Sequence, residues 1–397
     1  MSVVDIRSCP VCESSNYEQV YAQKFNSLAG MENADFYQKI LCCYKCGMVY
    51  VGEYLSDEML SRYYSTMSTY EYAEAGYEYP EAHRKRSENQ FLFLSKFSDR
   101  YGSVIDVGCS LGYTLSLFKK TGSEVLGIEP SPKLKKIAKD NYNVDVVTGF
   151  IDHDFNLEKP YDLVILSHVA EHLKFPLDIL HGVTNVLKEK GLVYIEIPSI
   201  ELFDERDLFQ FSFEHINYFS HGTLSNLMHQ AGFEEIDHII FENDDGTAPF
   251  YPTLGTLWLK TERTYPLINR YPHDSKVISH YVDLIKRYTG KLNERIAKIV
   301  KKYKRIAIWG AGTLTAQLLA QTPLSKANIV VIYDNDSKKD GLDMSGIPIR
   351  KPDISSNFVA ADDVDTIVIG SWSSQNEIYD RIRSLEKYGV IIHRLFF

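Results

Sequence analysis

A chain of 397 residues is too long for one ordinary hydrophobic core, so we expect two or three domains. Its composition, 44% hydrophobic and 24% charged, is that of a globular protein, and the net charge of −10 argues against a nucleic-acid partner. No run approaches the ~20 apolar residues of a membrane helix, and the N-terminus lacks the features of a signal peptide. We therefore expect a cytoplasmic protein that contacts no membrane.

Residues 1–60 are predicted to form a zinc-binding module. Five of the six cysteines lie in the first 46 residues, which favours a metal over disulfides in a reducing compartment. Cys42 is one cysteine more than a four-cysteine site needs, and it could compete with Cys43. The residues between the first pair (Cys9 and Cys12) and the second pair (Cys43 and Cys46) leave room for a hairpin at Tyr17 to Phe25 and an irregular insert. Four cysteines leave no open position on the metal, so the zinc is expected to be structural. Two Cys-x-x-Cys pairs would supply its four thiolates: Cys9, Cys12, Cys43 and Cys46.

The second predicted domain, residues 61–262, opens with a tyrosine-rich segment. Six tyrosines fall between positions 63 and 79, and Tyr70 and Tyr72 are among them. These rings could form a packing surface whose hydroxyls reach water, which is the simpler interpretation. Alternatively, they could form a lid whose phenols orient a substrate.

Residues 104–112 (VIDVGCSLG) are the centre of this domain. They indicate a buried strand and a glycine-rich turn, and a helix is expected to follow. Glycine lets backbone N–H groups approach a bound nucleoside, and Glu129, at the end of the next strand, is placed to accept from ribose hydroxyls. The spacing differs from the dinucleotide fingerprint and resembles the first motif of the class I S-adenosylmethionine (SAM) methyltransferases. It identifies four candidate cofactor-binding residues: Asp106, Gly108, Ser110 and Gly112.

Two further segments complete the expected cofactor site. Residues 161–173 (YDLVILSHVAEHL) are a buried strand that runs into a turn with Ser167 and His168, similar to the motif of these enzymes that passes under the cofactor. After the third strand, Phe150 could pack on the adenine and Asp152 could accept from its amino group. Strands alternate with helices through residues 86–262, which predicts a parallel, doubly wound sheet.

Residues 211–220 (FSFEHINYFS) contain Glu214 and His215 in a loop expected at the carboxyl end of the sheet, where ligands bind. Imidazole titrates near neutral pH, and a neighbouring carboxylate could orient it. Taken alone, such a pair is more often structural than catalytic.

The last part of the chain predicts a bridge and a third domain. Residues 263–303 contain apolar residues at helical spacing and are interpreted as a solvated bridging helix, and residues 304–397 restart an α/β pattern. There, the turn Gly310-Ala-Gly312 follows one strand and Asp334 ends the next. This turn could bind a nicotinamide dinucleotide, although the third glycine of that fingerprint is missing.

Together these parts resemble one family over essentially the full length, the zinc-containing, SAM-dependent sugar C-methyltransferases of deoxysugar pathways. The resemblance implies an α/β fold with an N-terminal four-cysteine zinc module, a central class I methyltransferase domain and a C-terminal Rossmann-like domain. It also implies a nucleotide-linked 4-keto sugar as substrate, methylated at C3. Tyr70-Glu71-Tyr72 resembles a Tyr-x-Tyr that faces the sugar, and Glu214-His215 resembles the start of a loop whose histidine is the candidate base.

In this interpretation His215 removes the C3 proton, Glu214 holds its imidazole, and Tyr72 or Tyr70 donates to the enolate oxygen. His168 is a second candidate base, whereas His172 is expected to be structural. Ser212 departs from the family pattern, which commonly has a tyrosine there that would help to stabilise an enolate. A sugar O-methyltransferase is therefore the alternative.

Two other classes of protein remain compatible with the sequence. One is an oxidoreductase that uses the C-terminal glycine turn, and the other is a non-catalytic assembly protein. A monomer is expected from the number of domains. Because the protein is acidic, an anionic nucleotide sugar needs a local basic site, for which residues 291–305 are the candidate stretch.

Overall fold

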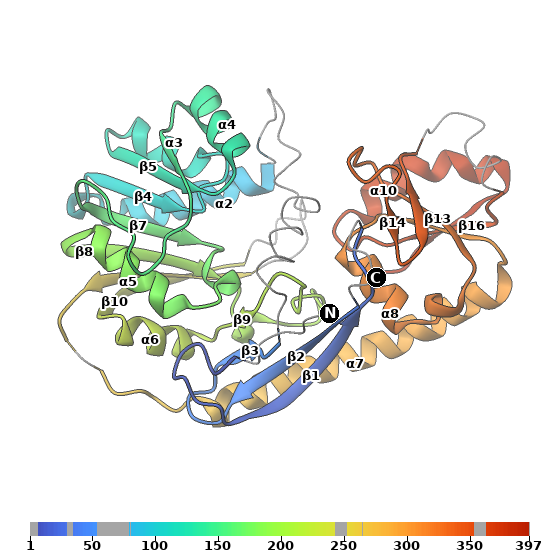
Figure 1. The fold of residues 1–397 in the computed structure, drawn as a ribbon, viewed down its shortest axis with the longest axis horizontal. Coiled ribbons are helices and arrows are strands. Elements are labelled where there is room, and N and C mark those ends of the chain that lie inside the picture. Colours follow the sequence, from blue (N-terminus) through green and yellow to red (C-terminus); the bar gives the residue numbers. More distant parts are fainter. Residues whose placement is uncertain are drawn as a thin grey trace.

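Three β-sheets organise the molecule (Figure 1). The structure, a computed structural model, describes residues 7–29, 35–53, 79, 81–242, 252–263, 265–352 and 363–396. Tyr70 and Tyr72, expected to face the substrate, lie outside the described residues. No helix in the described part of the chain is both long and apolar enough to cross a membrane.

The N-terminal sheet is a hairpin extended by two short strands. β1 (Tyr17–Phe25) pairs antiparallel with β2 (Phe36–Cys43), β2 with β3 (Val49–Val51), and β3 with β9 (Asn217–Tyr218). The expectation of a hairpin at residues 17–25 is wrong, because these nine residues (YEQVYAQKF) contain no turn-forming residue and form one strand. β9 follows directly on the loop with His215, so this sheet is joined to that loop.

The central sheet has the strand order β10-β11-β8-β7-β4-β5-β6. All its strands are parallel except β11, which runs antiparallel to both of its neighbours. The strands are β4 (Ser103–Val107), β5 (Glu124–Glu129), β6 (Val146–Thr148), β7 (Tyr161–Ser167), β8 (Leu187–Ile197), β10 (Phe233–Phe241) and β11 (Thr253–Lys260).

Helices cover both faces of this sheet. Val104 packs in a cluster with residues of α2, α3 and α4, whereas its neighbour Ile105 packs with α5 and α6, because successive side chains of a strand point to opposite faces. This arrangement confirms the expected doubly wound α/β class. The helices are α2 (Glu81–Ser95), α3 (Tyr113–Lys120), α4 (Pro132–Tyr142), α5 (Pro176–Val186) and α6 (His221–Gln230). Single 3-10 turns are η2 (Ser98–Arg100), η3 (Ala170–His172) and η4 (Ile200–Leu202).

A 32-residue helix, α7 (Tyr271–Lys302), runs beneath the N-terminal sheet and on to the C-terminal domain (Figure 1). Its first half buries Ile278 and Tyr281 against the N-terminal sheet, and its second half buries Ile296 and Ile299 against the C-terminal domain. α7 therefore bridges these two parts as expected, but as an amphipathic helix with one side buried and not as a solvated one.

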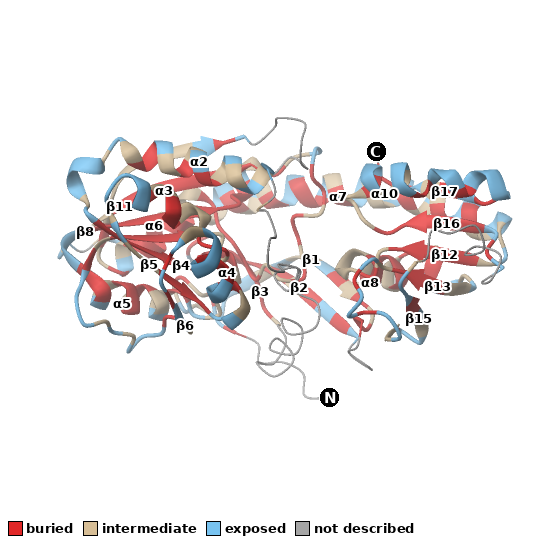
Figure 2. Ribbon diagram, turned by 90° about the horizontal axis from the view of Figure 1, so that it is seen from above, coloured by how far each residue is buried: buried red, intermediate tan, exposed pale blue. Residues whose placement is uncertain are grey.

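The C-terminal domain has a six-stranded sheet of order β14-β15-β13-β12-β16-β17. Figure 2 shows its strands buried between more exposed helices, as in the central domain. The strands are β12 (Ile306–Trp309), β13 (Ile329–Tyr333), β14 (Asp343–Met344), β15 (Ile347–Arg350), β16 (Thr366–Ile369) and β17 (Ile391–Arg394). The helices are α8 (Thr313–Gln321), α10 (Gln375–Ile382) and the 3-10 turns η5 (Pro323–Lys326) and η6 (Arg383–Tyr388).

Candidate active site and cysteine cluster

The glycine-rich turn between β4 and α3 adopts the left-handed conformations that its sequence anticipates. Gly108, Ser110 and Gly112 have φ angles of 72°, 49° and 77°. A Cβ at Gly108 would stand 3.1 Å from the Val169 side chain, so a larger residue would crowd the turn. The turn places its backbone over the carboxyl ends of the central strands, where ligands of such sheets bind.

Two buried carboxylates lie beside this turn. Asp106 lies near the end of β4 and is 5% exposed, and Glu129 ends β5 and is 7% exposed. Glu129 accepts hydrogen bonds from the N–H groups of Ser110 (3.1 Å) and Ser131 (3.0 Å). Burial, with the Glu129 charge nearby, raises the pKa of Asp106 to about 8, and burial also raises the pKa of Glu129.

This pair of acids suits SAM. Buried carboxylates with raised pKa values are stabilised by a cation or by hydroxyl donors, and SAM carries a sulfonium, an ammonium and ribose hydroxyls. Asp106, Ser110 and Glu129 are the residues that could hold those groups.

The proposed adenine segment begins next to Glu129. The Gly149 N–H donates to the Glu129 carbonyl oxygen (3.3 Å), and the ring of Phe150 is 76% exposed. Asp152 is also exposed, and its carbonyl approaches α5 so closely that a Cβ on Gly182 would stand 1.9 Å from it. Thus Phe150 and Asp152 are exposed in the segment that follows β6, and Ser167 lies at the end of β7.

His168 lies between two buried carboxylates at the ends of β7 and β8. Its Nδ1 is 3.1 Å from Oε1 of Glu171, and its Nε2 is 3.5 Å from Oε1 of Glu196. Burial disfavours its charged form, but hydrogen bonds to Glu171 and Glu196 outweigh burial and raise the pKa of His168. Burial opposes the ionisation of Glu171 too, but the hydrogen bond from His168 and the nearby histidines lower its pKa to about 2.

The sequence pattern did not single out Glu171 or Glu196. The signal for Glu196 was a lone charged residue in the apolar strand GLVYIEIP, since unpaired buried charges are costly. The signal for Glu171 was its position between the two histidines of SHVAEH, His168 and His172.

The loop with His215 is held from several sides. The His215 N–H donates to Oγ of Ser212 (3.2 Å), and the Tyr218 hydroxyl donates to the His215 carbonyl oxygen (2.8 Å). Gln38, from β2, donates to the Ser212 carbonyl oxygen (3.1 Å), which connects the N-terminal sheet to the loop. The ring of His215 lies 4.9 Å from that of His172, and burial together with His172 lowers the pKa of His215 to about 3.

The structure brings His215, His168 and His172 to one place, and it adds a carboxylate, Glu171, that the sequence did not indicate. Ligand atoms of Glu171, His172 and His215 all lie within 4.8 Å of one another. The backbone of Glu214 also reaches this place, since its carbonyl oxygen lies 3.1 Å from Nδ1 of His172. Glu171 is therefore the carboxylate beside His215.

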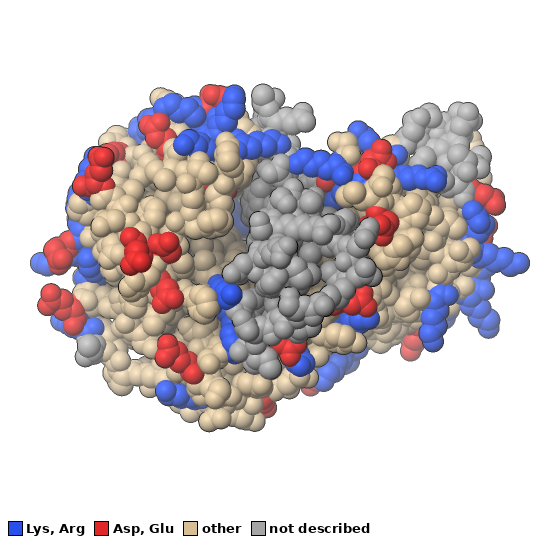
Figure 3. All heavy atoms as spheres, viewed as in Figure 1, with Lys and Arg blue, Asp and Glu red and all other residues tan. Residues whose placement is uncertain are grey.

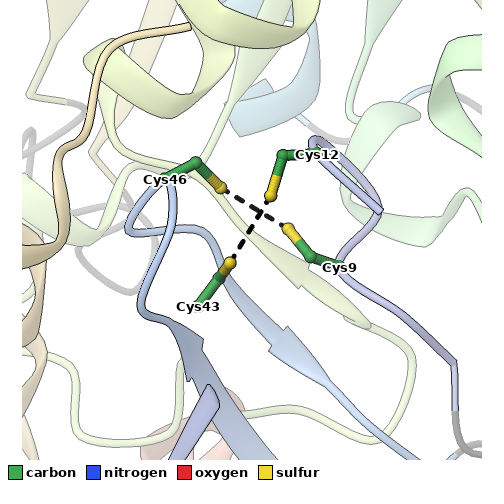
Figure 4. Close-up of side chains that lie close together, drawn as sticks. All are labelled: Cys9, Cys12, Cys43 and Cys46. Carbon is green, nitrogen blue, oxygen red and sulfur yellow. Dashed lines mark hydrogen bonds between the residues drawn. The ribbon is translucent and has the colours of Figure 1, made fainter. Parts of the chain in front are cut away.

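The four predicted cysteines meet in one cluster (Figure 4). The Sγ atoms of Cys9 and Cys46 are 3.5 Å apart, as are those of Cys12 and Cys43. Tetrahedral zinc with ~2.3 Å bonds to sulfur needs sulfurs about 3.8 Å apart, so the cluster fits that ion closely. Cys42 turns away and its Sγ contacts the Gly47 carbonyl oxygen (3.6 Å), so it does not compete with Cys43.

The acidic residue beside the glycine turn of the C-terminal domain is engaged by protein groups. Oδ2 of Asp334 accepts from the Ala311 N–H (2.7 Å) and lies 3.3 Å from Nζ of Lys339, which is 6% exposed. Asp334 stands at the position of the acidic residue that binds the ribose in dinucleotide sites, and here its carboxylate is paired with the lysine. This geometry disfavours the nicotinamide alternative.

Charged side chains of both signs are interspersed over the face seen in Figure 3. The lysines of residues 291–305, considered for an anionic nucleotide, are mostly exposed and follow the second half of α7. Their positions are Lys291, Lys298, Lys301, Lys302 and Lys304.

Two family models match the chain. A methyltransferase domain covers residues 80–238, and a C-methyltransferase C-terminal domain covers residues 270–394. The chain is 23% identical over 304 residues to the C-methyltransferase NovU of Streptomyces niveus, a match that covers 72% of this chain and 70% of NovU.

Shorter matches concern the central domain. The ribosomal protein L11 methyltransferase of Thermotoga neapolitana is 33% identical over 109 residues, 26% of this chain and 40% of that protein. The solved magnesium protoporphyrin IX methyltransferase of Synechocystis matches 52% of this chain and all of its own, with a TM-score of 0.41 and 14% identity. The fold assignment rests on the sheet order and on the domain match.

Proposed function

We propose that this chain, a SAM-dependent methyltransferase by its methyltransferase domain, methylates C3 of a nucleotide-linked 4-keto deoxysugar through an enolate. The observation that carries the proposal is the half-buried His215, held in a rigid loop at the end of the sheet that bears the SAM turn. The C-methyltransferase C-terminal domain and the similarity to NovU support transfer to carbon.

When bound, SAM supplies an electrophilic methyl group on a sulfonium. The residues of this chain have to generate a carbon nucleophile and hold it in line. The 4-keto group acidifies the C3 proton, and His215, neutral over the physiological range because burial lowers its pKa, takes that proton. The electron pair of the C–H bond then forms the enolate, whose carbon attacks the methyl group.

Ser212 is not assigned to stabilise the enolate in this proposal; its Oγ accepts a hydrogen bond from the His215 backbone N–H. The prediction that Tyr70 or Tyr72 donates a hydrogen bond to the enolate oxygen is retained. The presence of a serine at position 212, with no enolate-stabilising role, favours a second candidate function, O-methylation. In that reaction His215 takes a hydroxyl proton and no enolate forms.

The four-cysteine cluster is proposed to hold structural zinc, supported by its sulfur spacing. Metal analysis of the purified protein tests this directly, and about one zinc per chain is expected from four thiolate ligands. The monomeric state and the cytoplasmic location stay predictions.

The experiment for the function is mass spectrometry after incubation with SAM and nucleotide sugars in heavy water, pairing each 4-keto deoxysugar with its 4-hydroxy counterpart. C-methylation predicts one added methyl on the keto sugar only, and deuterium at C3 when SAM is replaced by S-adenosylhomocysteine. A methylated hydroxy sugar without exchange would establish the O-methyl alternative, and no methylated sugar would reject the proposed substrate class.

A further inference from the structure

We propose that Glu171 positions His215, by accepting a hydrogen bond from its ring N–H so that the other ring nitrogen is left to act as the base. This inference rests on the proposed function for its catalytic meaning. The hydrogen bond itself concerns only the protein and can be tested without any substrate.

Two buried atoms with unused hydrogen-bonding capacity point to this pairing. In the described residues, Oε2 of Glu171 and Nδ1 of His215 are both buried and have no hydrogen-bond partner. A ring nitrogen of His215 and a carboxylate oxygen of Glu171 lie within 4.8 Å. A buried acceptor without a partner is costly, so a small movement that pairs it with the neighbouring donor is favourable.

The other oxygen of Glu171 is fixed in place. Oε1 contacts Nδ1 of His168 (3.1 Å), and the far nitrogen of His168 faces Glu196 (3.5 Å). Glu196 in turn accepts from the hydroxyls of Tyr194 and Thr253, at 2.9 Å each. A carboxylate held through this chain of contacts has little freedom to turn, as a positioning residue requires.

The backbone supports the same arrangement. The Ile216 N–H donates to the Glu171 carbonyl oxygen (2.9 Å), so the residue after His215 is tied to the residue that bears the carboxylate. His168 has a φ of 55°, a left-handed conformation that costs free energy in a residue other than glycine.

The hydrogen bond from His215 to Glu171 determines which ring nitrogen carries each proton. His215 keeps the proton on Nδ1 and receives the substrate C3 proton on Nε2, while the C–H electron pair passes into the enolate. The imidazolium that forms is stabilised by the negative charge of Glu171. His168 has one ring nitrogen facing Glu171 and the other facing Glu196, so in this proposal it anchors the carboxylate and is not the base.

The test uses the full chain labelled with ¹⁵N at histidine, because ¹⁵N chemical shifts distinguish the two neutral tautomers of imidazole. We expect His215 to carry its proton on Nδ1 at neutral pH and to shift toward a mixture of tautomers in Glu171→Gln. Glu235→Gln is the matched control: Glu235 is bonded to His221 (2.8 Å), outside this site, and its loss should leave His215 unchanged.

In the methyl-transfer assay, Glu171→Gln should lower kcat by about 10²-fold or more with little change in KM. If Glu171→Gln does not fold, Glu171→Asp, which keeps the charge and shortens the reach, should show the same loss of the tautomer preference. His215 protonated on Nε2 in the natural protein, or a tautomer that responds to Glu214→Gln instead, would overturn the inference. A tautomer shift in a protein that methylates no sugar would leave the pairing standing and reject the proposed substrate.

Discussion

Val49, three residues beyond Cys46 in the N-terminal module, pairs in antiparallel register with Tyr218, three residues beyond His215. Arg7 strengthens the same junction, since its guanidinium donates to the Val51 carbonyl oxygen (2.9 Å) and to Oδ1 of Asn217 (2.8 Å). The cysteine cluster and the proposed base are therefore joined through the pairing of β3, which follows Cys46, with β9, which follows His215. A metal bound there would stabilise the strand pair to which the loop with His215 is joined.

Replacing one cysteine of the cluster should lower both the zinc content and the stability of the protein. Cys43→Ser is expected to lower the zinc content and to destabilise the fold by about 3 kcal/mol or more, because metal binding contributes folding free energy. Zinc analysis and thermal unfolding measure both effects. Cys42→Ser is the control, since its sulfur lies outside the cluster, and zinc loss in Cys42→Ser alone would contradict the assignment.

Asp106→Asn should make the SAM-free protein more stable at alkaline pH. Burial, with Glu129 nearby, raises the pKa of Asp106 from 3.8 to about 8, so the group favours folding fully below pH ~4 and loses this contribution as the pH rises to about 8. Asparagine does not ionise. Chemical denaturation at pH 5 and pH 8 should therefore show a stabilisation, relative to the natural protein, that grows toward pH 8.

SAM affinity provides the second readout for this variant. If Asp106 contacts the cofactor, Asp106→Asn should bind SAM at least ~10-fold more weakly, equivalent to about 1.4 kcal/mol. The exposed Asp140→Asn, which loses only an ion pair within a helix, should show neither effect. An Asp106 variant with normal SAM affinity would remove this residue from the cofactor site.

Gly182→Ala should displace the proposed adenine segment. The new Cβ would stand 1.9 Å from the carbonyl oxygen of Asp152, so α5 or the segment must move, and we expect a loss of about 2–3 kcal/mol and weaker SAM binding. Gly290→Ala, in α7 with open space around its Cβ, should instead stabilise by roughly 0.5–1 kcal/mol. Equal stability of both variants would contradict the close approach, and unchanged SAM affinity in Gly182→Ala would place the adenine elsewhere.

The C-terminal turn should not bind a nicotinamide dinucleotide. Asp334 is already paired with Lys339 and with the Ala311 N–H, so NADH should leave the protein fluorescence unchanged under conditions in which SAM gives a saturable signal. Lys339→Met should lower stability by about 1–3 kcal/mol because it leaves a carboxylate without its cation. Tight NADH binding that is lost in Asp334→Asn would restore the oxidoreductase alternative.

Local sequence pattern was sufficient to predict several parts of this molecule. Glycine spacing around Gly108, apolar runs in the strands and two Cys-x-x-Cys pairs predicted the turn, the doubly wound class and the four-cysteine cluster. Turn conformation, strand burial and thiolate spacing are properties of short segments, which is why they can be recognised without a structure. The order of the parts added the resemblance to a family of methyltransferases.

The packing of whole elements established which side chains meet. It placed Glu171 beside His215, although Glu214 is adjacent in sequence, because the carboxyl ends of parallel strands converge on one edge of the sheet. It also showed that α7 is a packing element, that Cys42 lies outside the cluster, and that Lys339 neutralises Asp334. Contacts across long stretches of chain depend on how elements pack together, and local pattern carries no information about that geometry.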